Sequence, residues 1–197
     1  MKEKGKYDSH AEIEVAEDII KRIFDLFDVT GSIEIRRRKE GTILDIQGCN
    51  NPGRLIGQKG ITLQSIQHIV TLIVCRKVEK PTDIIIDVNG YRERRRMELV
   101  DMAWRAFDKV IRTGRRVILR PMNAADRKII HETLSNEPDI ETFSIDEDPE
   151  TGMKCVQISI RGEEHPDNEE VFEDDFTEEE EYFEDYPEDY PEEEPLD

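Results

Sequence analysis

The sequence has few cysteines, one tryptophan and no long apolar run. Its three cysteines, Cys49, Cys75 and Cys155, lie far apart with no C-x-x-C spacing, which fits a reducing compartment better than a disulfide scaffold. The first six residues, Met-Lys-Glu-Lys-Gly-Lys, lead into no apolar segment of a signal peptide. Because no run of 18 apolar residues occurs, no transmembrane helix is expected either. We therefore expect a soluble, cytoplasmic protein that is not embedded in a membrane.

Signatures of catalysis are also missing from the sequence. It contains no P-loop, no dinucleotide fingerprint and no nucleophile–base pattern. His10, His68 and His165 have no metal-ligand spacing with one another or with cysteine. We therefore expect no enzyme activity, no cofactor and no metal site.

The C-terminal segment is the longest part of the sequence without lysine or arginine. The whole chain has a net charge of −19, which taken alone argues against nucleic-acid binding. Residues 163–197, however, hold 20 acidic residues and no lysine or arginine, which leaves 28 basic and 27 acidic residues in 1–162. Within 92–131 there are 12 basic and 5 acidic residues, a net charge of +7. The body is thus nearly neutral with a basic middle.

The acidic segment mixes in aromatic residues and prolines without apolar periodicity, so 162–197 is predicted to be a disordered tail.

Apolar periodicity predicts the order α-β-β-α-α-β for the first half of the chain. Ser9 and Glu12 have capping-box spacing at the start of the first helix, and Glu40-Gly41 is typical of a hairpin turn. The expected elements are a helix over 10–27, strands over 32–38 and 42–47, a short helix after Pro52, a helix over 61–76 and a strand over 83–88.

The second half predicts a long helix followed by a small β-α-β-β unit. The helix, over 91–113, has an apolar stripe of Met97, Val100, Trp104, Phe107 and Ile111. A strand over 117–120 and a helix capped by Asn123 follow. Two further strands, 141–146 and 154–160, are expected to form a hairpin around Pro149–Gly152. The predicted fold class is α+β.

Gly57-Gln58-Lys59-Gly60 is the strongest candidate site. Two glycines without Cβ atoms allow a close approach of the backbone, and the helix that follows directs free N–H groups toward that point. A phosphate of a nucleic-acid backbone is the natural ligand, as in the GXXG loop of KH domains. A plain helix–turn–helix corner is the alternative. Lys59 within the loop and Arg54 just before it favour phosphate binding.

Arg127 and His131 form a second candidate, since residues i and i+4 lie on the same side of a helix. Arginine offers a forked phosphate contact, and histidine donates a hydrogen bond or stacks on a base. Two solvated residues are the alternative, but the pair follows a basic helix. In that helix Arg94 and Arg95 are further candidates for backbone contact, although part of the cluster is expected to be solvated.

These residues resemble a known family. The run 54–63 (RLIGQKGITL) is similar to the GxxG segment of a type II KH domain. The runs 87–95 (DVNGYRERR), 121–123 (PMN) and 126–131 (DRKIIH) resemble the R-3-H domain, named for arginine, three residues and histidine. Both in this order resemble the Jag family, also called SpoIIIJ-associated, KhpB- or EloR-like proteins. The resemblance covers about 10–161 and implies a KH domain at 10–89 and an R-3-H domain, with a three-stranded sheet, at 90–161.

The resemblance further implies an RNA-binding regulator of bacterial cell elongation and division. Single-stranded RNA, or single-stranded DNA, would be the ligand, a small single-KH protein the heterodimer partner, and membrane-proximal division machinery a further contact. Three departures are visible. We expect no N-terminal Jag domain within this sequence. Lys154 alone stands where paired arginines are usual, which weakens the phosphate contact expected there, and the acidic tail is unfamiliar. The alternative function is a protein-interaction scaffold that dimerises with another KH protein and docks a basic partner through its tail. The charge split also predicts that the tail competes with RNA for the basic middle.

Overall fold

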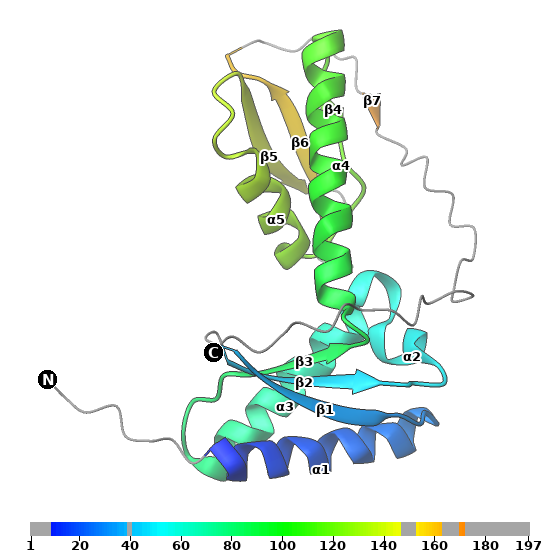
Figure 1. The fold of residues 1–197 in the computed structure, drawn as a ribbon. Coiled ribbons are helices and arrows are strands. Elements are labelled where there is room, and N and C mark those ends of the chain that lie inside the picture. Colours follow the sequence, from blue (N-terminus) through cyan, green and yellow to red (C-terminus); the bar gives the residue numbers. More distant parts are fainter. Residues whose placement is uncertain (1–8, 39–40, 147–152, 163–169, 172–197) are drawn as a thin grey trace, which may run out of the picture.

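The computed structural model describes residues 9–38, 41–146, 153–162 and 170–171. These residues form two units, each with helices, its own sheet and its own hydrophobic core. The long helix α4 (Tyr91–Thr113) begins directly after the last strand of the first unit and extends through the second (Figure 1). The predicted α+β class is confirmed.

The first unit has the order α-β-β-α-α-β that the sequence predicts. β1 pairs antiparallel with β2, and β2 pairs parallel with β3, so β2 is the central strand. A short 3-10 segment, Gln58–Gly60, separates the two consecutive helices. The elements are α1 (Ser9–Phe27), β1 (Ser32–Arg38), β2 (Gly41–Gln47), α2 (Pro52–Ile56), α3 (Ile61–Val78) and β3 (Ile84–Val88).

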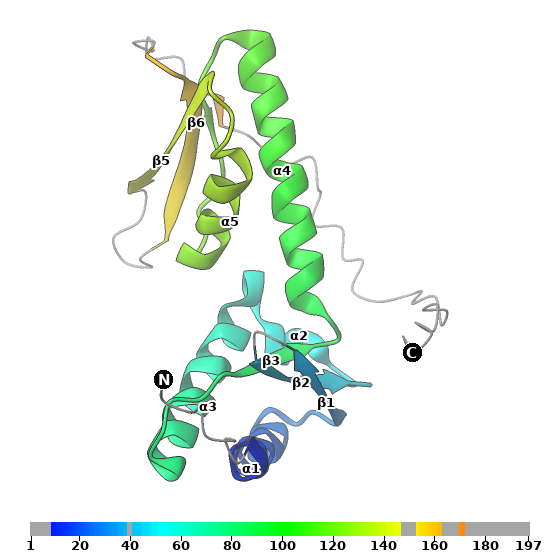
Figure 2. The same ribbon diagram turned by 60° about the vertical axis from the view of Figure 1, so that its left-hand side comes forward.

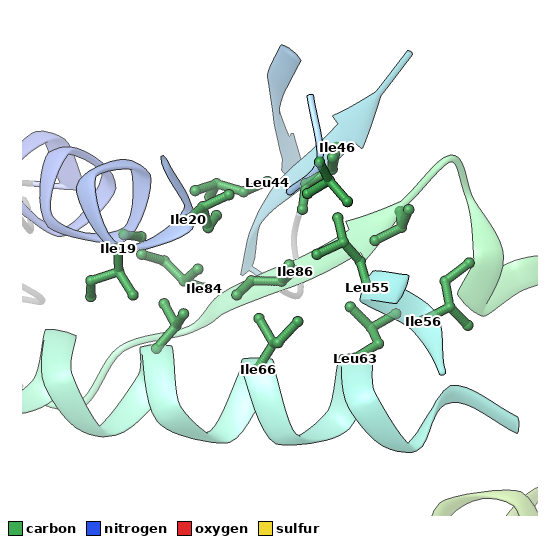
Figure 3. Close-up of a cluster of buried hydrophobic side chains, with 14 of the residues drawn as sticks. Ile19, Ile20, Leu44, Ile46, Leu55, Ile56, Leu63, Ile66, Ile84 and Ile86 are labelled. Atoms are coloured by element: carbon green, nitrogen blue, oxygen red, sulfur yellow. The ribbon is translucent and has the colours of Figure 1, made fainter. Parts of the chain in front are cut away.

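The core of the first unit lies between one face of the sheet and the helices α1, α2 and α3. Leu44 and Ile86 from neighbouring strands are fully buried, as is Leu55 from α2. Figure 3 shows Leu63 and Ile66 of α3 directed toward these strands from the opposite side. Because α2 ends against this core, the segment that follows it has a fixed position.

The second unit packs two helices on one face of a four-stranded sheet. The strand order is β5-β6-β4-β7, and α4 and α5 contact each other above the sheet (Figure 2). Asn123 caps α5 as predicted, since its Oδ1 accepts a hydrogen bond from the backbone N–H of Asp126 at 2.9 Å. The elements after α4 are β4 (Val117–Ile118), α5 (Ala124–Leu134), β5 (Ile140–Asp146), β6 (Lys154–Ile160) and β7 (Glu170–Val171).

The strand β7 differs from the prediction in two ways. The sheet has four strands rather than three, and the prediction of disorder for the tail is wrong for Glu170–Val171. β4 would otherwise leave backbone N–H and C=O groups on its outer edge, and β7 pairs with that edge in parallel. The rest of the tail and the predicted turn at 149–152 lie outside the described residues, as does Glu40 of the first predicted turn.

Most of the apolar stripe predicted for α4 lies outside its buried side, although Phe107 packs against the core. Met97, Trp104 and Ile111 are exposed by 57%, 39% and 47%. The side that faces the core is narrower and includes two alanines, which let the helix approach the sheet closely. The buried residues of α4 are Leu99, Met102, Ala103, Ala106 and Val110.

Candidate nucleic-acid interface

The loop between α2 and α3 has a backbone that only glycine adopts easily at two positions. Gly57 has φ 70° and ψ −179°, and a Cβ there would collide with the side chain of Thr62. Gly60 has φ 79° and is the N-cap of α3. Between them Lys59 is left-handed, with φ 50° and ψ 30°. The loop is therefore a tight, specific conformation.

The first helical turn of α3 opens toward this loop. Gly60 provides no side chain that could cap the helix, and the N–H of Ile61 donates to the carbonyl of Gln58. The N–H groups that follow Ile61 in the first turn are therefore the candidates for binding an external acceptor. α3 is 18 residues long, and the positive end of its dipole adds to the attraction for an anion. Gln58 is exposed and Lys59 half-buried beside it. The loop thus offers backbone donors, one cation and one amide to a phosphate group.

Gly60 also fixes how the loop meets the long helix. A Cβ on Gly60 would lie 2.9 Å from Cε1 of Tyr91, the first residue of α4. Arg92, the next residue, donates from Nε to the carbonyl of Ile86 (2.9 Å) and from Nη2 to Oε1 of Gln67 (3.1 Å). The start of α4 is therefore held against β3, α3 and the loop together.

Arg54 lies before the loop, but its side chain turns to α1. Its Nη1 donates to the carbonyl of Phe27 at 2.8 Å, at the C-terminal end of that helix, and lies 3.7 Å from Oδ2 of Asp28. Half of the side chain is exposed. In this conformation Arg54 stabilises the end of α1, and its predicted phosphate contact stays a prediction.

A buried ion pair positions the start of α5 against α4. Arg95 donates to Oδ2 of Asp126 from Nη2 (3.1 Å) and from Nε (3.3 Å), and the two side chains are only 17% and 8% exposed. Burial works to lower the pKa of Arg95, but Asp126 and Glu98 outweigh it and hold the pKa above its ordinary value. Arg95 thus makes a structural bond here, and its predicted contact with RNA stays a prediction.

The predicted pair Arg127 and His131 does lie on one side of α5. Arg127 donates from Nη1 to the carbonyl of Met122 at 3.0 Å. His131 lies 2.7 Å through Nδ1 from Oγ1 of Thr142 and 3.0 Å through Nε2 from Oγ of Ser144. The pair lines an open surface pocket of about 430 Å³, whose lining residues are Ala124, Arg127, Lys128, His131, Glu132, Ser135 and Ser144.

The electrostatics of this pocket favour the neutral form of His131. Burial lowers the pKa of His131 from its ordinary value of 6.5, and the nearby charge of Arg127 lowers it further. A neutral imidazole between two hydroxyls donates one hydrogen bond and accepts the other. The cation for an incoming phosphate is then Arg127, with Lys128 at the rim in an ion pair with Glu132 (3.5 Å).

Lys154 and Arg94, the remaining candidates, lie in different places. The backbone of Lys154 pairs with Met122, the residue whose carbonyl also accepts from Arg127, so Lys154 begins β6 close to the α5 pocket. Arg94 lies in the first turn of α4, where its backbone N–H donates to the carbonyl of Gly90. Lys154 thus lies near the pocket without lining it, and Arg94 lies in the turn of α4 that begins beside the loop.

Thr142 and Ser144 were missed by the sequence reasoning. They alternate along β5 and therefore point to the same face of that strand. That alternation was a readable signal, but nothing in the sequence showed that this face would meet His131.

The loop and the pocket lie at the same end of α4. Tyr91, which contacts Gly60, and Arg95, which holds Asp126, are four residues apart and so lie on one side of the helix. Asp126 immediately precedes Arg127. The two candidate sites are thus linked through one helical turn.

Comparison with known proteins agrees with these features. The model of the R-3-H domain family matches residues 97–156, which include Arg127 and His131. RNA-binding protein KhpB of Clostridium symbiosum is 34% identical over 152 residues, which are 76% of this chain and 67% of the relative. The chain belongs to the KhpB family. Proteins of the same name from Lactiplantibacillus plantarum and Bacillus subtilis are 35% and 34% identical over 109 and 95 residues, or 55% and 47% of this chain.

The chain spans a different share of each KhpB relative. It covers two thirds of the C. symbiosum protein but 33% of the L. plantarum and 46% of the B. subtilis protein. The helices that the structure describes are all too short or too polar to cross a membrane. No group of three histidine, cysteine or acidic side chains within the described residues is arranged to hold a metal ion.

Proposed function

We propose that this KhpB-family chain binds single-stranded RNA at two points, the Gly57–Gly60 loop and the Arg127–His131 pocket. The first unit is then a type II KH domain at 10–89 and the second an R-3-H domain at 90–161. The names of the curated relatives, which describe RNA-binding proteins, support the ligand class. The element order and the loop geometry of the first unit support the KH assignment.

The placement of both sites at one end of α4 carries this proposal. An RNA strand that binds the loop would pass next to Tyr91 as it leaves the loop. The ion pair of Arg95 with Asp126 sets the α5 pocket on the same side of α4. One strand therefore reaches both sites without bending around the molecule. Phosphate contacts dominate at both sites, so the affinity should fall with salt and tolerate many sequences.

The test is a double variant in which Gln58 and Lys59 are both replaced by aspartate. Two carboxylates at the mouth of the loop repel phosphate, so crosslinking to RNA should be lost and the dissociation constant should rise strongly at low salt. The charge-matched control is Arg76→Gln with Lys77→Asp, which lowers the net charge by the same three units at the exposed far end of α3. Unchanged RNA binding by the double variant would refute the assignment of the loop. Equal losses in the control would show that only net charge matters.

A second function, dimerisation with another KH protein, is favoured by one observation. Ile69 and Leu72 of α3 are 49% and 55% exposed, although they lie in the middle of a helix of the first unit. Ile69→Glu with Leu72→Glu should abolish copurification of a small single-KH partner and leave RNA crosslinking at the loop intact. A partner that still copurifies would exclude this face.

The cellular role follows from the resemblance alone and stays a proposal. We expect RNA to be favoured over single-stranded DNA, and the bound transcripts to concern cell elongation and division. Crosslinking in cells followed by sequencing checks both; a random sample of transcripts would contradict the proposed regulatory role.

A further inference from the structure

The exposed stripe of α4 has the spacing of a helix-packing seam. Its members follow one another at intervals of three and four residues, with Met97, Trp104 and Ile111 seven apart, which is the repeat of a coiled-coil seam. Trp104 also contacts Phe107 edge-on, with ring centroids 5.5 Å apart. Exposed apolar surface organised in this way is typical of an interaction site.

This stripe points away from α5. Trp104 follows Arg95 by nine residues, which is two and a half turns at 3.6 residues per turn and so puts Trp104 on the opposite side of α4. Arg95 contacts α5 through Asp126. The sheet order places β7 on the same outer side, because α5 covers β5 and β6 whereas β7 lies beyond β4 (Figure 1). The strand β7 thus lies on the side of α4 away from α5, as the stripe does.

β7 also sets the direction of the chain that follows it. Only residues 114–116 separate α4 from β4, so β4 turns back along the helix, and β7 runs parallel to β4. β7 therefore lies near the C-terminal end of α4 and runs toward its N-terminal end. Met97 to Ile111 spans about 21 Å at a helical rise of 1.5 Å per residue. Residues 172–186 are as many as residues 97–111, so this segment is long enough to cover that distance.

The sequence of that segment complements the stripe. Four of its five aromatic residues fall at intervals of four, seven and three, with Tyr182 as the fifth, and acidic residues fill most of the positions between them. The end of α4 where the segment starts is basic, with Arg112, Arg115 and Arg116. Aromatic side chains suit the exposed apolar stripe, and the acidic residues suit the basic end. The four residues at these intervals are Phe172, Phe176, Phe183 and Tyr186.

We propose that residues 172–186 dock on the stripe Met97–Trp104–Ile111 of α4 within the same molecule. The docking itself does not depend on RNA binding. Its consequence for RNA rests on the proposed function: acidic residues held beside the basic second unit compete with phosphate, so removal of the segment tightens RNA binding at low salt.

Trp104 reports the docking directly, because it is the only tryptophan of the chain. We compare the full chain with a chain ending at Val171, which keeps β7, and with a full-length variant in which Phe172, Phe176, Phe183 and Tyr186 are all serine. The serine variant keeps every acidic residue and so separates packing from charge. In both variants Trp104 fluorescence should shift to longer wavelength and be quenched more strongly by acrylamide.

Three results would overturn the proposal. Identical Trp104 emission in all three proteins would show that the stripe is open in the full chain. A shift on truncation but not in the serine variant would assign the effect to charge. Protection of Trp104 that depends on protein concentration and survives truncation would assign the stripe to a second copy of the chain.

Discussion

The two proposed RNA contacts are built in opposite ways. The Gly57–Gly60 loop is a backbone site, in which positive φ angles and missing Cβ atoms create the opening. The α5 pocket is a side-chain site, in which Arg127 and His131 are held by hydrogen bonds to Met122, Thr142 and Ser144. A backbone site fails when a side chain is added. A side-chain site fails when a partner is removed, so the two respond to different substitutions.

The largest effect is expected from Arg95→Ala, which should act on the second site and spare the first. The change leaves the buried carboxylate of Asp126 without its cation, and breaking a buried ion pair costs about 3–5 kcal/mol. Urea unfolding should show this loss in the second unit. RNA contact at α5 should weaken, while crosslinking at the loop persists.

Glu98→Ala is the matched control for Arg95→Ala. Glu98 binds the same guanidinium at 3.0 Å, but its side chain is 53% exposed, and such pairs contribute about 0–1 kcal/mol. A loss as large as that of Arg95→Ala would mean that the buried pair with Asp126 is not what positions α5.

Gly57→Ala should break the backbone site. A residue with a Cβ at this φ and ψ is strained by about 1–3 kcal/mol, and its Cβ collides with Thr62. We expect lower stability by urea unfolding and lost RNA contact at the loop. Gly48→Ala, at φ 61° with nothing within 4 Å of the added atom, isolates the strain without the collision. An equal loss of stability in both variants would show that the collision with Thr62 adds nothing to the backbone strain.

The two sites also differ in how much of each the sequence could predict. The loop depends on four consecutive residues, so its pattern was readable, and local periodicity gave the element order correctly. The pocket depends on Arg95 with Asp126 and on His131 with Thr142, pairs that are 31 and 11 residues apart and join different elements. Residue types and spacing identified Arg127 and His131, but the bonds that hold them require the tertiary fold.

The buried side of α4 shows a different limit. Bulk and hydrophobicity favoured the stripe with Met97 and Trp104, whereas the fold buries the side with Ala103 and Ala106. Two seams of apolar residues on one helix are indistinguishable by periodicity, and packing distance to the sheet decides between them. β7 was missed for a similar reason, since a two-residue strand depends on the open edge of β4.

Among smaller effects, His131→Ala should weaken RNA binding by roughly two- to tenfold, if RNA takes over one of the ring hydrogen bonds from Thr142 or Ser144, since one hydrogen bond contributes about 0.5–1.5 kcal/mol. Fluorescence anisotropy with labelled single-stranded RNA measures this. Ser135→Ala removes another residue that lines the pocket, one whose hydroxyl donates to the carbonyl of Glu132, and should leave affinity nearly unchanged. Similar losses in both variants would indicate a general disturbance of the pocket rather than a contact by His131.

The smallest effect is a pH dependence of stability that the side-chain site has and the backbone site lacks. Burial, aided by Arg127, lowers the pKa of His131 in the folded chain below its ordinary value of 6.5. Below that value the unfolded chain binds the proton more readily than the folded one, so the free energy of unfolding should fall as the pH drops below about 6.5 and stay unaffected above it. Urea unfolding of the RNA-free protein and of His131→Gln on both sides of that pH isolates the effect, because the other histidines are common to both. A wild-type chain whose stability follows that of His131→Gln at every pH would contradict the shift. It would also mean that Thr142 and Ser144 accept the charged ring as readily as the neutral one.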